Sequence, residues 1–261
     1  MNKWSIRRKR IALSIVLGFL VIIIGLPLYF FLKTTPTCFD GKQNADETGI
    51  DCGGSCKLLC SNALSPILIH GDPRILKIAT STFEVVASVE NPNPLGTILK
   101  AGYSFKIYSD QSLGPKKIIQ GVAYVPKASA FVVFQGPFDM GGVTPTRVVF
   151  EWDPATLIWE KDTSVTPNIS IDEPPMTGAN NSPRIDATVK NMTLNVLNNI
   201  EFVVLVYDLN DNIIGASKTF VDSLNSNEST PIVFTWPNAF NSSSTPYHIF
   251  SRVLPDASYI Q

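Results

Sequence analysis

Residues 202–215 read FVVLVYDLNDNIIG, two apolar runs joined by a polar turn, and this stretch decides the fold. Side chains of a strand alternate between its two faces, so the set that begins at Phe202 and the set that begins at Val203 point in opposite directions. Both sets are apolar, which predicts a strand that is covered on both faces. Asp and Asn in the DLNDN segment tolerate left-handed backbone conformations, so this segment predicts a hairpin turn.

The chain after residue 65 repeats itself at a spacing of about one hundred residues, which is the signature of an internal duplication. Six blocks recur in the same order: SPILI (65–69) and TPNISI (166–171), FEVVASVENPNP (83–94) and RIDATVKNMTLN (184–195), YSFKIYSD (103–110) and FVVLVYD (202–208), Gly121 and Gly215, FVVFQGPF (131–138) and IVFTWPNAF (232–240), and TPTRVVFEWDPA (144–155) and TPYHIFSRVLPDA (245–257). The short alternating apolar runs in each repeat unit predict about seven antiparallel strands. The expected fold is therefore all-β, with tandem Ig-like sandwiches over residues 65–163 and 164–261.

Two resemblances accompany this pattern. The segment VASVENPNPLG, with Asn91, Pro92 and Asn93, resembles the strand and turn of the late-embryogenesis-abundant type 2 (WHy) sandwich family. The second unit is similar to the FxLYD family of bacterial β-sandwich domains through LVYDLNDNIIG (205–215), with Val206 in place of the expected Leu. Both families imply Ig-like binding or spacer domains without a shared catalytic site, and a fold analogy does not by itself confer a function.

All four cysteines lie upstream of the sandwiches, at Cys38, Cys52, Cys56 and Cys60. An even number of cysteines in a short segment outside a membrane predicts two disulfides, and spacing alone does not choose among the three pairings. A four-thiolate zinc site is the alternative, although its usual paired spacing is matched at one end only. Residues 33–64 are therefore expected to form a Cys-rich collar held by covalent bonds.

Oxygen ligands lie between these cysteines, interleaved with glycines. Asp40, Asn44, Glu47 and Asp51 offer the chemistry that calcium prefers, so a calcium site is one prediction, and no other cofactor is expected. The spacing is not that of an EF-hand. In the alternative interpretation, these polar groups cap the turns of a disulfide-tied knot.

The pattern C-x-D-G-x-x-N-x-x-E-x-G-x-D-C-G-G-x-C, from Cys38 to Cys56, resembles a short Cys-rich module of bacterial surface and secreted proteins. The resemblance covers a small part of the chain, and the Lys57–Leu59 spacer is more apolar than that of related modules. It implies a bacterial cell-surface context, and it implies no particular activity.

An unbroken apolar run occupies residues 11–32 and follows a basic leader, residues 1–10. The run is long enough to cross a bilayer as a helix. Positive charges gather before it, which predicts a single-pass anchor with the N-terminus in the cytoplasm and the C-terminal part outside. A cleaved signal peptide is the alternative, but the apolar stretch is longer than is usual for one and no A-x-A site follows.

The part of the chain after the anchor is acidic, with 16 basic and 22 acidic residues, which argues against nucleic acid as a partner. No catalytic motif occurs, and His70 and His248 are expected in surface or packing roles. We therefore expect a membrane-anchored, non-enzymatic interaction or scaffold protein of the cell envelope, with the bilayer and other envelope proteins as partners. The alternative is a surface receptor that binds a ligand or calcium through the Cys-rich loop or a cleft between the sandwiches.

Overall fold

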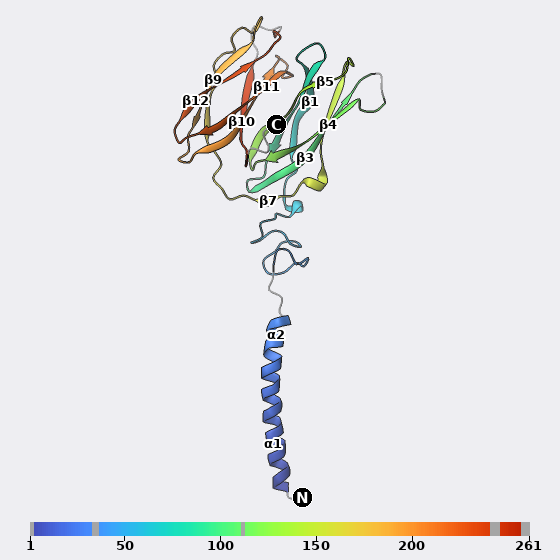
Figure 1. Cartoon of the computed structure of the whole chain (residues 1–261), viewed down its shortest axis with the longest axis vertical. Coiled ribbons are helices and arrows are strands. Elements are labelled where there is room, and N and C mark those ends of the chain that lie inside the picture. The colour runs from blue at the N-terminus through green and yellow to red at the C-terminus, as the bar shows by residue number, and fades with distance from the viewer. Residues whose placement is uncertain (1–2, 33–36, 111–112, 241–245, 257–261) are drawn as a thin grey trace. The chain divides into compact units, whose positions relative to one another are not determined.

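The computed structural model describes residues 3–32, 37–110, 113–240 and 246–256 of the chain. The chain forms two compact units, residues 1–56 and residues 57–261. Figure 1 shows that the long helix belongs to the first unit and that all the strands belong to the second. Every strand pair is antiparallel, so the predicted all-β class is confirmed.

The N-terminal unit begins with a helix in three consecutive segments: α1 (Lys3–Leu20), the π-helical η1 (Val21–Gly25) and α2 (Leu26–Leu32). The apolar run predicted a helix from residue 11, but the helix begins at Lys3, because Lys and Arg are good helix formers. Pro27 has no N–H to donate to the preceding turn, and the wider π-helical turn lies immediately before α2, where this bond is missing.

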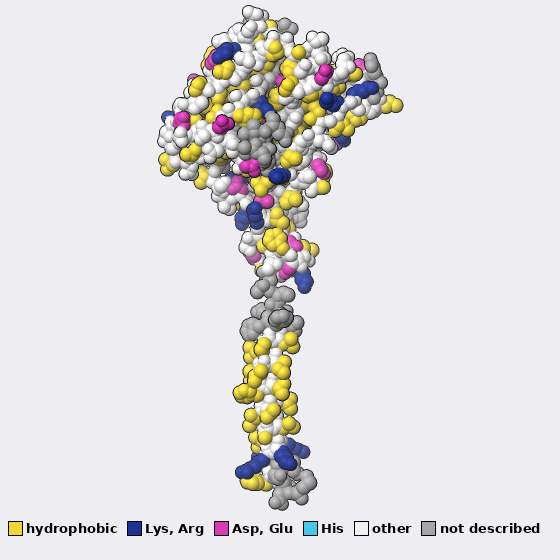
Figure 2. All heavy atoms as spheres, viewed as in Figure 1, with side chains coloured by type: hydrophobic (Ala, Val, Ile, Leu, Met, Phe, Trp, Pro, Cys, Tyr) yellow, Lys and Arg dark blue, Asp and Glu magenta, His cyan; other side chains and the backbone are white. Residues whose placement is uncertain are grey.

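The stretch from Arg7 to Tyr29 is long and apolar enough to cross a membrane. None of its side chains is buried within the protein. Figure 2 shows apolar side chains along the helix and Lys and Arg side chains at its N-terminal end. A signal sequence near an N-terminus can also be long and apolar enough to meet this requirement, so we call this helix a candidate membrane span.

The first sandwich contains seven strands: β1 (Leu68–Lys77), β2 (Thr82–Asn91), β3 (Gly96–Tyr108), β4 (Lys117–Val125), β5 (Ser129–Asp139), β6 (Arg147–Trp152) and β7 (Glu160–Lys161). They form the sheets β1-β2-β5 and β4-β3-β6, and the short β7 pairs with β3. The 3-10 helix η2 (Ser61–Ala63) precedes β1, and η3 (Pro154–Thr156) lies between β6 and β7. Its core is dense in aromatic rings, with Phe105 and Phe150 in contact at 4.9 Å between ring centroids.

The second sandwich contains six strands among the described residues: β8 (Ile169–Asp172), β9 (Arg184–Asn191), β10 (Leu197–Tyr207), β11 (Ile213–Leu224), β12 (Ser229–Thr235) and β13 (Tyr247–Val253). Their sheets are β8-β9-β12 and β11-β10-β13. Counted from its first strand, each sandwich therefore has the same order, 1-2-5 in one sheet and 4-3-6 in the other. The β10–β11 hairpin turns at DLNDN, where Asp211 has a φ of 60°, as its sequence predicted.

A third apolar core joins the two sandwiches into four stacked sheets, which can be followed in Figure 1. Val86 and Val132 of the β1-β2-β5 sheet pack with Val203 and Leu205 of β10, and all four side chains are buried. The opposite face of β10 packs into the core of the second sandwich. The prediction that β10 is covered on both faces is thus confirmed, and the two sandwiches form one continuous body.

Strand β3, in the outer sheet of the first sandwich, is polar at two positions where its counterpart β10 in the third core is apolar. Ser104 and Lys106 of β3 occupy the strand positions that Val203 and Leu205 occupy in β10, and Lys106 forms an ion pair with Glu151 on the surface. The outer face of β3 therefore lacks the apolar side chains that β10 contributes to the third core.

The same buried asparagine closes a turn in each sandwich. Asn191 is fully buried, and its Nδ2 donates to the backbone carbonyls of Asn195, Leu224 and Asn225 at 2.8, 2.9 and 3.1 Å. Its Oδ1 accepts from the backbone N–H of Thr193 at 2.8 Å. Every polar group of this amide is therefore satisfied without water.

Asn91 has the corresponding position in the first sandwich and is also fully buried. Its Nδ2 donates to the backbone carbonyls of Gly96 and Pro126, both at 2.7 Å, and its Oδ1 accepts from the N–H of Asn93 at 3.0 Å. The Asn-Pro-Asn turn is thus the place where the end of β2 is fixed to two other segments of the sandwich.

We expect Asn191→Ala to lower the free energy of unfolding by at least about 2 kcal/mol. The carbonyl of the buried Leu224 and the partly buried carbonyls of Asn195 and Asn225 lose their donor, and the loss at one buried carbonyl costs roughly 1–3 kcal/mol. Urea denaturation of the full chain in detergent micelles measures the change. The exposed Asn198 of β10 provides the control, and Asn198→Ala should change stability by less than about 0.5 kcal/mol. Equal effects of the two variants would contradict the structural role of Asn191.

Candidate binding cleft and cysteine-rich segment

All four cysteines are oxidised. A disulfide joins Cys38 to Cys56 with 5.7 Å between the Cα atoms, and Cys52 and Cys60 are also disulfide-bonded. The predicted disulfides are confirmed, and the zinc alternative is wrong, because a sulfur in a disulfide offers no thiolate to a metal. Cys38, Glu47 and Cys56 form the one group of described His, Cys, Asp or Glu side chains close enough to share an ion, and two of its members are this disulfide.

The four residues predicted as calcium ligands lie in one hydrogen-bonded network. Asp40 Oδ2 accepts from the side-chain amide of Asn44 at 2.8 Å. The carboxylate of Asp51 accepts from the backbone N–H groups of Asp40 and Gly41, both at 3.0 Å. Glu47 Oε2 accepts from the N–H of Asn44 at 3.1 Å. The structure therefore brings the predicted set together.

In this network the carboxylates satisfy backbone N–H groups, as the turn-capping interpretation predicts. The hydrogen bond from Asn44 is the largest influence on Asp40 and helps hold the pKa of that carboxyl below its usual value. A calcium ion would compete with two N–H groups for the oxygens of Asp51. Calcium binding stays a prediction. Calorimetric titration of calcium into the full chain, and into its Asp51→Ala variant, would test it.

A cleft of about 750 Å³ lies between the two sandwiches. Tyr124 and Pro126 line it from the first sandwich, Ile169 and Val253 line it from the second, and the connecting segment 162–167 forms part of its wall. Its size is within the range of small-ligand and peptide sites. This is the inter-sandwich cleft that the sequence offered as an alternative location for a ligand.

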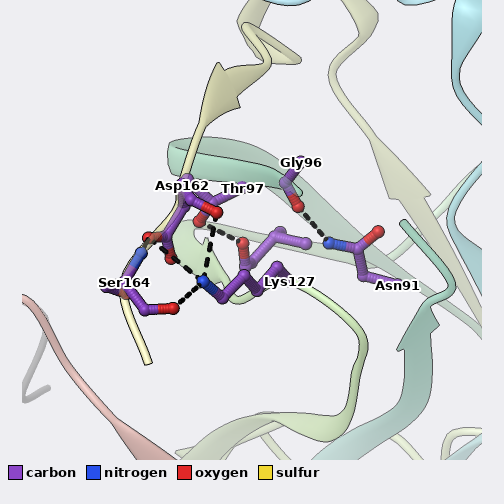
Figure 3. Close-up of polar contacts among 7 residues, drawn as sticks. Asn91, Gly96, Thr97, Lys127, Asp162 and Ser164 are labelled. Atoms are coloured by element: carbon purple, nitrogen blue, oxygen red, sulfur yellow. Dashed lines mark hydrogen bonds and ion pairs between the residues drawn. The ribbon is translucent and has the colours of Figure 1, made fainter. Parts of the chain in front are cut away.

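A buried lysine in the lining of the cleft holds the connecting segment, and Figure 3 shows its contacts with Asp162 and Ser164. Lys127 is only 7% exposed, and its Nζ donates to the backbone carbonyls of Asp162, at 3.1 Å, and Ser164. Its Nζ also forms an ion pair with Asp162 Oδ1 at 3.3 Å. Burial disfavours the charged form of Asp162, but the hydrogen bonds from Ser164 and the charge of Lys127 outweigh it and hold the pKa of that carboxyl below its usual value.

The turn that carries Lys127 is held by the Asn-Pro-Asn segment. Asn91 donates to the carbonyl of Pro126, the residue before the lysine, at 2.7 Å. The N–H of Ala128, the residue after it, donates to the carbonyl of Asn93 at 2.9 Å. The sequence motif therefore positions a side chain of the cleft, although it was recognised only as a mark of the fold.

A buried ion pair lies at the inner side of the cleft. Arg252 Nε donates to Glu201 Oε1 at 3.0 Å, and the two side chains are 9% and 6% exposed. Arg252 Nη1 donates to the carbonyl of Tyr124 at 2.8 Å, and the guanidinium lies over the ring of Phe131 at 4.8 Å from its centroid. Arg252 and Glu201 belong to the second sandwich and their neighbours to the first, so this pair links the two.

Glu84 is a second buried acid at the contact between the sandwiches. It is 6% exposed and lines a small pocket with Gly215 and Trp236. Burial raises the pKa of Glu84 to about 7, and a hydrogen bond from the backbone of Ala216 offsets part of the effect. The other carboxyl oxygen, Oε1, is buried and has no partner among the described residues. Glu84 is therefore protonated in the folded protein over a pH range in which an exposed glutamate is ionised.

We expect the stability of the protein to fall as the pH rises from about 4.5 to about 7. In this window the folded state keeps the Glu84 proton and the unfolded state has lost it, so raising the pH favours unfolding by up to about 3 kcal/mol. Other groups titrate in the same window, so the measurement is the difference between wild type and Glu84→Gln in urea denaturation at several pH values. If the difference in unfolding free energy between wild type and Glu84→Gln stayed constant over this pH range, the result would contradict the buried, protonated state of Glu84.

The two histidines have acidic partners that lie far from them in sequence. His70 Nε2 is 2.6 Å from Glu90 Oε2, and His248 Nδ1 is 3.3 Å from Glu173 Oε1. Both imidazoles are largely exposed, and exposed ion pairs contribute little to stability. Both histidines therefore lie at the surface, one of the two settings that the sequence predicted.

No known protein family matches the sequence, and no curated protein matches it. Among solved structures, the chain is similar to a transglutaminase from red sea bream, with 11% identity and a TM-score of 0.27. The match covers 70% of this chain and 29% of that enzyme's chain. A likeness this weak carries no inference about activity, and the resemblances to the WHy and FxLYD families stay predictions.

Proposed function

We propose that the chain is a membrane-anchored, extracytoplasmic and non-enzymatic interaction or scaffold protein of a bacterial cell envelope. The observation that carries the proposal is the presence of oxidised cysteines in the same chain as a candidate membrane span. Disulfides persist in oxidising compartments, which supports a location outside the cytoplasm for residues 38–60. The basic side chains before the span support an N-terminus on the cytoplasmic side.

The β-rich unit supports a structural role. Its three apolar cores join the two sandwiches in one continuous body, as a rigid spacer or platform requires. The shared strand order of the two sandwiches supports an origin by duplication. Polar outer sheets keep such a body soluble, which leaves its cleft and strand edges as the places where a partner can bind.

The cleft supports a second candidate, a surface receptor that holds a ligand between the sandwiches. Its volume is that of a binding site, and the lysine that fixes its wall is held by several hydrogen bonds. The two candidates differ in a simple measurement. A receptor gains thermal stability when its ligand is added, whereas a scaffold is stabilised only by its protein partner.

Topology is tested by protease treatment of intact spheroplasts that carry a tag at the C-terminus. We expect the tag to be digested and the mature chain to keep its N-terminal residues on sequencing. A protected tag would contradict the orientation. Loss of residues before Cys38 from the mature chain would show a cleaved signal sequence in place of an anchor.

The scaffold role is tested by crosslinking on intact cells, followed by purification of the chain. We expect other envelope proteins to be crosslinked, and deletion of residues 57–261 should remove them while the truncated chain stays in the membrane. Turnover of a substrate by the purified chain, abolished by one side-chain replacement outside the cores, would overturn the non-enzymatic proposal.

A further inference from the structure

We infer that the cleft between the sandwiches binds an extended, uncharged peptide segment of a partner protein, which adds as a strand to the edge of β13 that no described strand occupies. The inference deepens the proposed interaction role and rests on it, because it names the class of partner and the way it is held. Addition of a strand to a sheet edge is a recurring mode of peptide recognition, in which main-chain hydrogen bonds supply affinity.

The first observation is the direction of the peptide groups of β13. In an antiparallel ladder, alternate residues turn their N–H and C=O groups toward the same neighbour. The carbonyl of Pro246 and the N–H of Leu254 both bond to β10, at 2.8 and 2.9 Å, so the even-numbered residues of β13 face β10. Ser251 and Val253 therefore turn their peptide groups away from β10.

The second observation is that this outer edge is bound at one end and open at the other. The N–H of Ile249 points outward and donates to Glu173 Oε1 at 2.9 Å, which confirms the direction. Ser251 and Val253 both line the cleft. No strand among the described residues pairs with this side of β13. The open edge therefore lies where the cleft provides room for another strand.

A second open edge faces the same cleft. Asn168, the residue before β8, accepts from the N–H of Met192 at 2.9 Å, so Ile169 turns its own peptide groups away from β9. Ile169 lines the cleft opposite the end of β13. Two strand edges from different sheets thus present donors and acceptors to one space, which an extended backbone can satisfy and a compact ligand cannot.

The charges of the cleft indicate the character of the peptide. Lys127 is paired with Asp162, Lys57 with Glu160 at 2.7 Å, and Arg252 with Glu201, and Lys161 is the remaining charged residue of the lining. A charged side chain of a ligand would meet no free countercharge in these three pairs and would be desolvated at a cost. The lining residues between the pairs include Leu99, Pro126, Val165, Pro167, Val253 and Leu254, so uncharged and apolar side chains fit best.

Short random peptides displayed on phage, selected on the full chain in lipid nanodiscs, test the inference. The variant Ser251→Pro removes one outward N–H and leaves the bonds to β10 intact, since proline is tolerated on a strand edge whose N–H faces away from the sheet. We expect selected peptides to be uncharged and to bind Ser251→Pro about tenfold more weakly or worse, the effect of losing a main-chain bond at a shielded edge.

Ser229→Pro is the matched control. Ser229 lies on the edge strand β12 and does not line the cleft. It is two residues from Pro231, a native proline of the same strand, so the peptide nitrogens of both residues point away from β9. Selected peptides should bind this variant as they bind the wild type. Two versions of each peptide carry N-methyl groups, one at the odd-numbered amides and one at the even-numbered amides. We expect one version to lose binding and the other to keep it, a result that side-chain recognition alone would not produce.

Three results would overturn the inference: no peptide is enriched on wild type over Ser251→Pro, N-methylation is tolerated at every position, or peptides bind only after removal of residues 257–261. The last result would assign the cleft to the chain's own C-terminus. Crosslinking to envelope proteins tests the scaffold role independently, so a partner that is still captured after a failed peptide selection would locate binding elsewhere on the chain.

Discussion

Arg252→Ala is expected to lower the free energy of unfolding by about 3–5 kcal/mol, because it leaves the buried carboxylate of Glu201 without its countercharge. The same replacement removes the hydrogen bond to the carbonyl of Tyr124 and the contact with the ring of Phe131. Three losses at the contact between the sandwiches thus arise from one side chain. Urea denaturation of the full chain in detergent micelles measures the effect.

The exposed pair of Lys106 and Glu151 is the control for this prediction. These side chains are 32% and 49% exposed, and Lys106→Ala should cost at most about 1 kcal/mol. The double replacement of Arg252 by Met and Glu201 by Leu should recover most of the lost stability, because no unpaired charge remains. An Arg252→Ala cost no larger than that of Lys106→Ala would show that the buried pair is not what holds this region.

The second large effect concerns the third core. Leu205→Ala should cost about 2–5 kcal/mol, the range for removing a fully buried leucine side chain. Leu205 contacts residues of both sandwiches, so hydrogen-exchange protection should fall in β2 of the first as well as in β10 of the second. The exposed Val122 of β4 serves as the control, and Val122→Ala should change protection in neither strand.

Protection that falls in β10 and stays unchanged in β2 would mean that the sandwiches open independently. In that case the third core would be a contact between two autonomous domains. The tryptophans report on each sandwich, Trp152 and Trp159 in the first and Trp236 in the second. Coincident changes in their fluorescence during unfolding would be a further check on a single cooperative unit.

The fold followed from periodicity, because alternation reports burial directly. The apolar residues on both faces of 202–207 predicted a doubly covered strand, and the structure places the two faces in two different cores. What covers the second face was not predicted, although the signal was present. The aligned block of the first unit has Ser104 and Lys106 at those positions, which marks the face that the first sandwich leaves exposed.

The candidate site was less accessible to sequence reasoning. Residue type indicated Asp40 and Asp51 as ion ligands, but type does not tell whether a carboxylate meets an ion or a backbone N–H, and here it meets N–H groups. Arg252 and Glu201 were not among the predicted site residues, because their pairing depends on the register of two strands that are distant in sequence. The cleft itself depends on how the sheets stack, which no local pattern encodes.

The four-sheet stack also limits how such a chain can evolve. A gene segment for either sandwich alone would encode a protein with a bare apolar sheet, the face that includes Val86 or the face that includes Leu205. Such a segment cannot be shuffled into another protein without several simultaneous changes from apolar to polar. The two halves are therefore expected to be inherited together, and substitutions on one side of the shared face should be accompanied by compensating substitutions on the other.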